Sequence, residues 1–275
     1  MKKTAFILGI LLLSACTPSW KPSGVENLVV EGWIESGDFP VVMVTTTVPT
    51  STEYQNWDDL RSHLVRWAKV SVSDGQESVV LTGMPGKRYF PPYVYTTTRM
   101  RGVPGKKYSL TVEYGGEVVN AVTSIPFPVA LDSVRVRPAG DGSFEVMACF
   151  NDNPEEKNYY KLFTRVVGRD SIFVPSLPGE LDDAVIHGPV SVPVFKGRTF
   201  TNMEKETGFS GGEVVDVRLC TMDAASYAFW KSYSRMASMS SSPVFPAEYN
   251  PESNIDGALG CWCGYGVSVK RVVVE

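Results

Sequence analysis

Histidine is scarce in this sequence, since 275 residues contain only His63 and His187. Histidine is the side chain most often used as a general base and as a metal ligand, so the sequence offers few candidates for either role. Basic residues are also few, at 26 Lys and Arg against 30 Asp and Glu, which gives a formal charge of −4. A nucleic-acid surface needs clustered positive charge. We therefore expect no nucleic-acid partner, no metal and no cofactor.

Long hydrophobic runs are absent after residue 16, where no segment has 18 uninterrupted apolar residues. A membrane-spanning helix would need such a segment. The one early apolar run, residues 5–13, follows Lys2 and Lys3. It is too short to cross ~30 Å of hydrocarbon and has the form of a signal-peptide core. We expect residues 1–15 to be a leader and the rest to be an aqueous body.

The leader ends in Leu13-Ser14-Ala15-Cys16, which resembles the bacterial lipobox. That resemblance implies that Cys16 is acylated and becomes the new N-terminus. Buried acyl methylenes contribute ~0.8 kcal/mol each, so two or three chains anchor a protein almost permanently. Residues 16–27 are rich in Pro and Ser and are expected to form a flexible tether. Thr17, in place of Asp, favours the outer membrane; the missing acidic run after Cys16 leaves the leaflet open.

Residues 28–128 contain seven or eight short segments typical of β-strands. Residues 41–48 are rich in Val and Thr, whose branched side chains suit a pleated surface. Asp74-Gly75 separates two β-rich segments as a hairpin turn does, and Tyr108–Tyr114 alternates apolar and polar residues. Short strands with regular turn signals predict an immunoglobulin-like or transthyretin-like sandwich.

A second domain, residues 129–275, is expected after the strand-breaking Pro126 and Pro128. Its pattern is again mainly β, with one packed helix near 223–239 that Asp223 can cap. Residues 238–260 have no periodicity, and a loop of this length in a compact domain is often functional or a structural lid. The fold class is therefore mainly β, with two β domains and one α-helix.

Six segments, in order, resemble a family of Bacteroidota outer-membrane lipoproteins that is classed as a domain of unknown function. Genes for members of that family often lie beside genes for TonB-dependent receptors. The family implies a location, a two-part β architecture and a possible receptor partner, but no catalytic residues. The segments that carry the resemblance are 28–34 with 40–42, 68–75, 102–110, 152–162, 227–230 and 253–260.

Four cysteines remain after Cys16, namely Cys149, Cys220, Cys261 and Cys263. An exported protein meets an oxidising compartment, so one or two disulfides are allowed, and Cys149–Cys220 is one candidate pair. Buried free thiols are the alternative. The C-x-C spacing of Cys261 and Cys263 fits zinc sites poorly.

Three further groups of residues are candidates for chemistry or binding. Residues 151–156 offer oxygen ligands that could hold calcium, but these residues form an Asx turn in any case. Residues 180–183 are a second acidic turn and are expected to be a solvated loop. Gly208–Gly212 is only loosely like a nucleophile elbow. Aromatic rings on Pro-containing loops, at 90–95 and 245–249, would either bind a sugar or protein or plug the ends of a sandwich.

The function expected from these features is a non-enzymatic accessory of a TonB-dependent receptor, acting by ligand binding or docking and anchored in the outer membrane at Cys16. Two alternatives stay open. One is a component of cell-envelope assembly or adhesion, which the structural class allows. The other is an exported hydrolase with paired carboxylates in a groove, which no sequence argument excludes.

Overall fold

The computed structural model describes residues 27–47, 61–184, 186, 188–197, 208–239 and 250–275. The fold is mainly β, as predicted, and the described residues form sixteen strands, a short 3-10 helix η1 (Arg61–His63) and one α-helix, α2 (Ala224–Met239). The strands are β1 (Leu28–Glu35), β2 (Val41–Thr46), β3 (Lys69–Ser73), β4 (Ser78–Val80), β5 (Thr82–Pro85), β6 (Tyr93–Thr96), β7 (Lys107–Tyr114), β8 (Glu117–Ser124), β9 (Leu131–Pro138), β10 (Phe144–Asp152), β11 (Tyr159–Val166), β12 (Val174–Asp182), β13 (Gly188–Val194), β14 (Val214–Met222), β15 (Ile255–Asp256) and β16 (Leu259–Val273).

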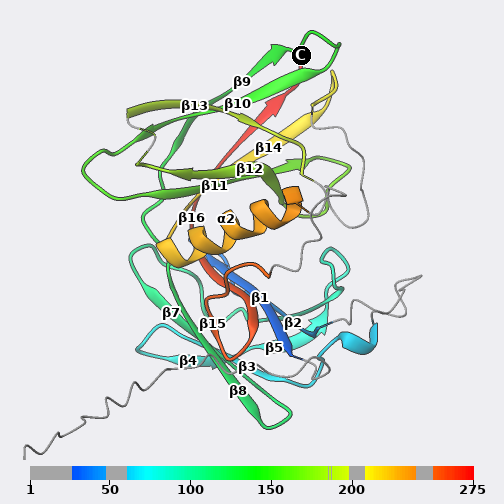
Figure 1. Cartoon of the computed structure of the whole chain (residues 1–275), viewed down its shortest axis with the longest axis vertical. Coiled ribbons are helices and arrows are strands. Elements are labelled where there is room, and N and C mark those ends of the chain that lie inside the picture. The colour runs from blue at the N-terminus through cyan, green and yellow to red at the C-terminus, as the bar shows by residue number, and fades with distance from the viewer. Residues whose placement is uncertain (1–26, 48–60, 185, 187, 198–207, 240–249) are drawn as a thin grey trace, which may run out of the picture.

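The strands form one sheet of eight, one of five and one of three. The eight-stranded sheet has the order β12-β11-β14-β16-β1-β2-β6-β5 and runs through both halves of the molecule. The five-stranded sheet, β15-β8-β7-β3-β4, packs on its lower half, and the three-stranded sheet, β13-β10-β9, packs on its upper half (Figure 1). Each half is therefore a two-layer β structure, and the largest sheet is common to both.

The lower half has its own hydrophobic core. Strand β7 alternates exposed and buried residues, and its Tyr108, Leu110 and Val112 face inward. Strand β1 contributes Val30 and Ile34 from the opposite sheet. This alternation is typical of strands that have one solvent-exposed face and one buried face. Burial of the apolar faces stabilises the packing of the two sheets.

A second core fills the upper half, between β9, β10 and β13 on one side and β11, β14 and β16 on the other. Phe150 and Tyr160 meet there with their ring centroids 5.0 Å apart. The alternation of β14 places Val215, Val217 and Leu219 in this core. On the other face of β14, Cys220 and Met222 pack with residues of α2.

Strand β16 joins the two halves. Residues 259–265 pair in parallel with β1, and residues 266–273 pair antiparallel with β14. Strand β15 also lies in the lower half, because Ile255 pairs with Ala121 of β8. The division expected at residue 128 therefore differs from the structure at its C-terminal end: residues 255–265 complete the N-terminal sandwich. A linear pattern cannot show this, because the pairing partner lies more than 200 residues away.

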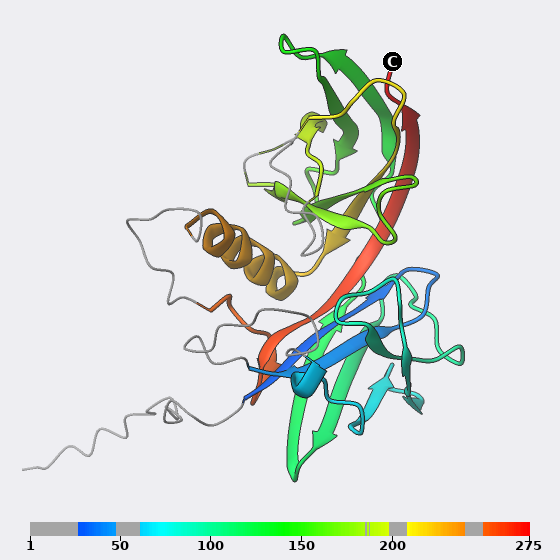
Figure 2. The same cartoon turned by 90° about the vertical axis from the view of Figure 1, so that its right-hand side faces the viewer.

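Helix α2 lies in the concave side of the curved eight-stranded sheet (Figure 2). Asp223 caps it, since its Oδ1 accepts a hydrogen bond of 2.9 Å from the Ser226 N–H. The Asp223 Oδ2 accepts the Ser124 N–H at 2.9 Å, so the cap also ties α2 to the end of β8. Among the described residues, no helix is long and apolar enough to cross a membrane.

Candidate functional site

An aromatic cluster under α2 is the most distinctive group of side chains in the structure. We call the sheet surface that α2 covers, together with the inward side of that helix, the junction face, because β1, β11, β14 and β16 meet there. Phe163 packs edge-on against Trp230 at 5.5 Å and against Tyr265 at 5.8 Å. The Trp230 indole N–H donates to the Tyr265 hydroxyl at 2.7 Å. The apolar stripe of α2 thus packs against a sheet, as predicted.

The rim of the junction face carries half-buried rings. Tyr159 stacks on Tyr227 with centroids 4.7 Å apart, and Trp33 lies 6.0 Å from Tyr89. The Phe173 ring contacts two guanidinium groups, with its centroid 3.7 Å from that of Arg218 and 4.8 Å from that of Arg165. Such rings combine a large apolar surface with a polar edge, the chemistry that favours Tyr and Trp at binding surfaces.

Two buried ion pairs hold this region together. Arg218 of β14 bonds Glu35 of β1, which links the two halves across β16. Lys161 of β11 is fully buried; its ammonium donates to Glu180 and, at 2.8 Å, to the Ser176 carbonyl. Burial lowers the pKa of Lys161, and Glu180 opposes that effect. Buried charges must be paired in this way, because desolvation of a lone ion is costly.

Unlike those charged residues, Glu31 on the junction face has no ion-pair partner among the described residues. It lies on β1 between Met43 of β2 and Cys261 of β16, and Tyr233 of α2 is close enough to interact with it electrostatically. The Glu31 side chain is exposed to water. Partial desolvation by the neighbouring protein nevertheless raises its pKa to about 7. A carboxyl group in such a setting marks a candidate binding site.

The four described cysteines, Cys149, Cys220, Cys261 and Cys263, are free and buried. Cys149 of β10 lies 3.5 Å from the Ser191 hydroxyl, whereas Cys220 belongs to the cluster under α2. The candidate pair Cys149–Cys220 is therefore not formed: the residues lie in different sheets, and their side chains belong to different layers. Cys261 and Cys263 join Cys220 under α2, where burial raises the pKa of the Cys220 thiol.

The acidic segments have structural partners. The Asn153 side chain accepts the Glu155 N–H at 3.2 Å, which is an Asx turn. The prediction of a solvated loop at Glu180 is wrong. Glu180 lies in β12 and its side chain is buried. Asp182 is paired with Lys157 at 2.5 Å. In the part of the chain that the structure describes, no His, Cys, Asp and Glu side chains form a group that could hold a metal ion.

Residues 208–212 and the tyrosines of the 90–95 segment have structural roles. Phe209 forms a β-bridge with Phe144, so residues 208–212 approach a strand end rather than a strand-to-helix turn. Tyr93 and Tyr95 plug the lower sandwich, with hydroxyls that donate to the Arg66 and Val65 carbonyls at 3.2 and 2.8 Å. Cys16, His187 and residues 245–249 lie outside the described residues.

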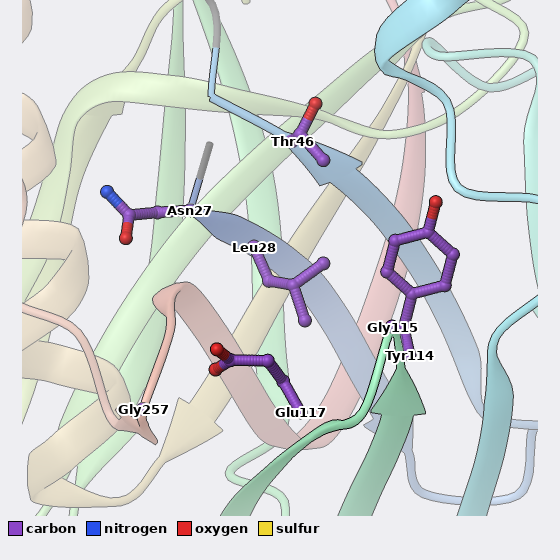
Figure 3. A pocket seen from close by; sticks show the side chains of 7 residues that line it. All are labelled: Asn27, Leu28, Thr46, Tyr114, Gly115, Glu117 and Gly257. Atoms are coloured by element: carbon purple, nitrogen blue, oxygen red, sulfur yellow. The ribbon is translucent and has the colours of Figure 1, made fainter. Parts of the chain in front are cut away.

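A small pocket opens at the lower end of the molecule, where β1 begins (Figure 3). Asn27 and Leu28 line it beside the β7–β8 turn, which contributes Tyr114 and Glu117. Its mixed lining identifies no ligand. The pocket does show that the first described residues lie against this turn.

Comparisons with known proteins give a family and a distant structural likeness. The family model described as "Domain of unknown function (DUF4249)" matches residues 17–271. No curated protein matches the chain. A solved cytokine receptor complex is 12% identical, with a TM-score of 0.26, over 89% of this chain and 95% of that one. The chicken CNTN1 FN1-FN3 domains are 14% identical, with a TM-score of 0.20, over 72% and 60%.

Proposed function

Since the chain belongs to the DUF4249 family, we propose that it is a lipoprotein of the outer membrane of Bacteroidota, anchored at Cys16, and a non-enzymatic accessory of a TonB-dependent receptor. The observation that carries the proposal is the lipobox Leu13–Cys16 at the end of a short apolar leader. The receptor partner is proposed because the resemblance to the lipoprotein family implies one.

The shape of the molecule supports a role at a membrane surface. Strand β1, at the start of the described chain, lies in the lower half of the molecule, and the C-terminus lies at the top (Figure 1). The 11 residues between Cys16 and Leu28 span at most about 40 Å. The lower sandwich would then lie near the bilayer, and the junction face would be held above it.

The rim of the junction face, together with the exposed side of α2 beside it, is the surface that we assign to the ligand or receptor. Its half-buried Trp33, Tyr227 and Tyr159 have the chemistry of contact anchors. Glu31 adds a single exposed carboxylate whose pKa is raised by partial desolvation. This combination suits a partner that presents an apolar group beside a hydrogen-bond donor or a positive charge.

Lipid attachment is tested by metabolic labelling with palmitate in the native host. The wild-type protein should incorporate label and sediment with the outer membrane. The Cys16→Ala variant should lose the label. Labelling of that variant, or an unlabelled wild-type protein, would contradict the anchor.

Receptor association is tested by gentle detergent purification of the tagged protein from its native membrane. A stoichiometric TonB-dependent barrel should be recovered with the wild-type chain. Lys231→Glu reverses a charge on the exposed side of α2 and should reduce that recovery; Lys270→Glu, an exposed change on β16, is the matched control. Recovery of the lipoprotein alone, with the barrel present in the lysate, would exclude a stable complex.

A further inference from the structure

The lower end of the molecule presents aromatic and aliphatic side chains to water. Trp67 is 90% exposed, Val118 of β8 is 58% exposed, and Tyr114 at the end of β7 is 38% exposed. Tryptophan is seldom so exposed, because its ring removes a large apolar area from water when it is buried.

Strand pairing places Trp67 and Tyr114 at the same end of the sandwich. Lys69, two residues after Trp67, is opposite Glu113, and their side chains form an ion pair of 2.7 Å. Tyr114 directly follows Glu113. We call the surface formed by Trp67, Tyr114 and Val118 the tether end.

The tether end is also where the chain emerges from its N-terminal segment. Leu28 pairs with Thr46, and Thr45 forms a β-bridge with Leu64, three residues before Trp67. Adjacent strands are about 5 Å apart, so Leu64 lies roughly 10 Å from the start of β1. Tyr114 and Leu28 line the same pocket (Figure 3).

The backbone around Trp67 is held in place by its neighbours. The Arg66 carbonyl accepts the Tyr93 hydroxyl at 3.2 Å, and the Ala68 N–H donates to the Tyr95 hydroxyl oxygen at 3.1 Å. Tyr95 is itself buried in the lower core. The indole of Trp67 is therefore presented to water by an ordered segment.

We propose that the tether end rests on the bilayer surface, with the rings of Trp67 and Tyr114 in the interfacial layer of the lipid. This inference rests on the proposed lipid anchor, because an acyl chain on Cys16 holds the start of β1 within about 40 Å of the membrane. Trp and Tyr favour the interface, where one side of the ring is apolar and the other meets water.

Charge gives the contact a further property. Among the described residues at this end, Arg61, Arg66 and Lys69 stand against Glu113 and Glu117, so the net charge is small. Electrostatic attraction to anionic lipid is therefore weak, and insertion of the rings supplies the affinity. Binding should depend little on salt, since screening acts on charges and not on apolar contact.

The test uses the mature chain with Cys16→Ser, so that binding through the body is measured without the acyl anchor. Vesicles of phosphatidylethanolamine and phosphatidylglycerol are titrated at low and high salt. Trp67→Ser should weaken binding by roughly tenfold, the loss expected when one large ring no longer leaves water. Phe127→Ser, which changes an exposed ring outside the tether end, should leave binding unchanged.

A second measurement uses the lipidated chain in vesicles that contain brominated lipid. Tryptophan emission should be quenched, and Trp67→Phe should remove part of that quenching. Equal loss of binding in Trp67→Ser and Phe127→Ser, or quenching unchanged in Trp67→Phe, would overturn the proposal. So would a Trp67→Ser variant that binds vesicles normally but recovers less receptor, since the ring would then contact protein. Palmitate labelling is scored separately, so failure of the anchor and failure of the tether end are distinguishable.

Discussion

Glu31 shows how a single side chain can mark a surface. Its strand neighbours, Val30 and Gly32, face the lower core or lie close to it, so the pleat turns Glu31 towards α2. There its flanking residues are Met43 and Cys261. No described residue forms an ion pair with it, and the lost hydration raises the pKa of Glu31 to about 7.

This raised pKa predicts that stability falls as the pH rises. In the unfolded chain Glu31 titrates near 4.5, so between about 4.5 and 7 the folded state holds a proton that the unfolded state has lost. The stabilisation is present below 4.5 and is lost by about 7. Because water reaches the carboxylate, we expect an effect on the order of 1 kcal/mol. Glu31→Gln should remove this pH dependence, as measured by urea unfolding at pH 5 and pH 8. An unchanged difference between the two pH values would contradict it.

At the scale of the element, α2 is fixed to the sheet by Lys161 and Glu180. Lys161 lies 5.0 Å from the Trp230 ring and bonds Glu180 of β12. The Ser234 hydroxyl of α2 also donates to Glu180, at 2.6 Å. One buried carboxylate thus connects β11, β12 and α2.

Removal of one partner should cost far more than removal of both. Lys161→Met leaves Glu180 buried without its counter-ion, and breaking such a pair costs about 3–5 kcal/mol. The double variant Lys161→Met, Glu180→Leu removes both charges and should recover most of that loss. Urea unfolding of the two variants measures the difference. A single variant as stable as the wild type, or a double variant no better than the single, would show that the pair does not fix α2.

At the scale of the whole molecule, β16 makes the two halves depend on each other. Trp262 of β16 is fully buried in the lower core, and its indole N–H donates to the Tyr108 carbonyl at 2.9 Å. Gly264 passes so close to Ser124 that a Cβ would lie 2.2 Å from its carbonyl oxygen. The N-terminal sandwich therefore closes only when the end of the chain arrives.

Residues 27–128 alone should not form a stable sandwich, because β1 would lose β16, one of its two neighbours, and the core would lose Trp262. We expect poor amide dispersion in a ¹H–¹⁵N NMR spectrum of that fragment. The control joins residues 253–265 to its C-terminus through a flexible linker of about ten residues. That chain should fold, with a dispersed spectrum. A well-folded short fragment would contradict the role assigned to β16.

Local pattern was sufficient for much of this protein. The alternation in Tyr108–Tyr114 and the branched residues of 41–48 predicted strands, and the apolar stripe after Asp223 predicted a packed helix. These signals are local, because each depends on side-chain spacing along a few turns or pleats. The sequence by itself therefore determined the mainly β class and the helix, and it carries the segment on which the proposed lipid anchor rests.

Only the tertiary structure decided which segments lie together. The crossing of β16, the burial of Glu180 and the separation of Cys149 from Cys220 depend on contacts between distant residues. The exposure of Trp67 and the surroundings of Glu31 follow from the same contacts. The local spacing of residues does not predict these long-range contacts, because they depend on how the whole chain packs.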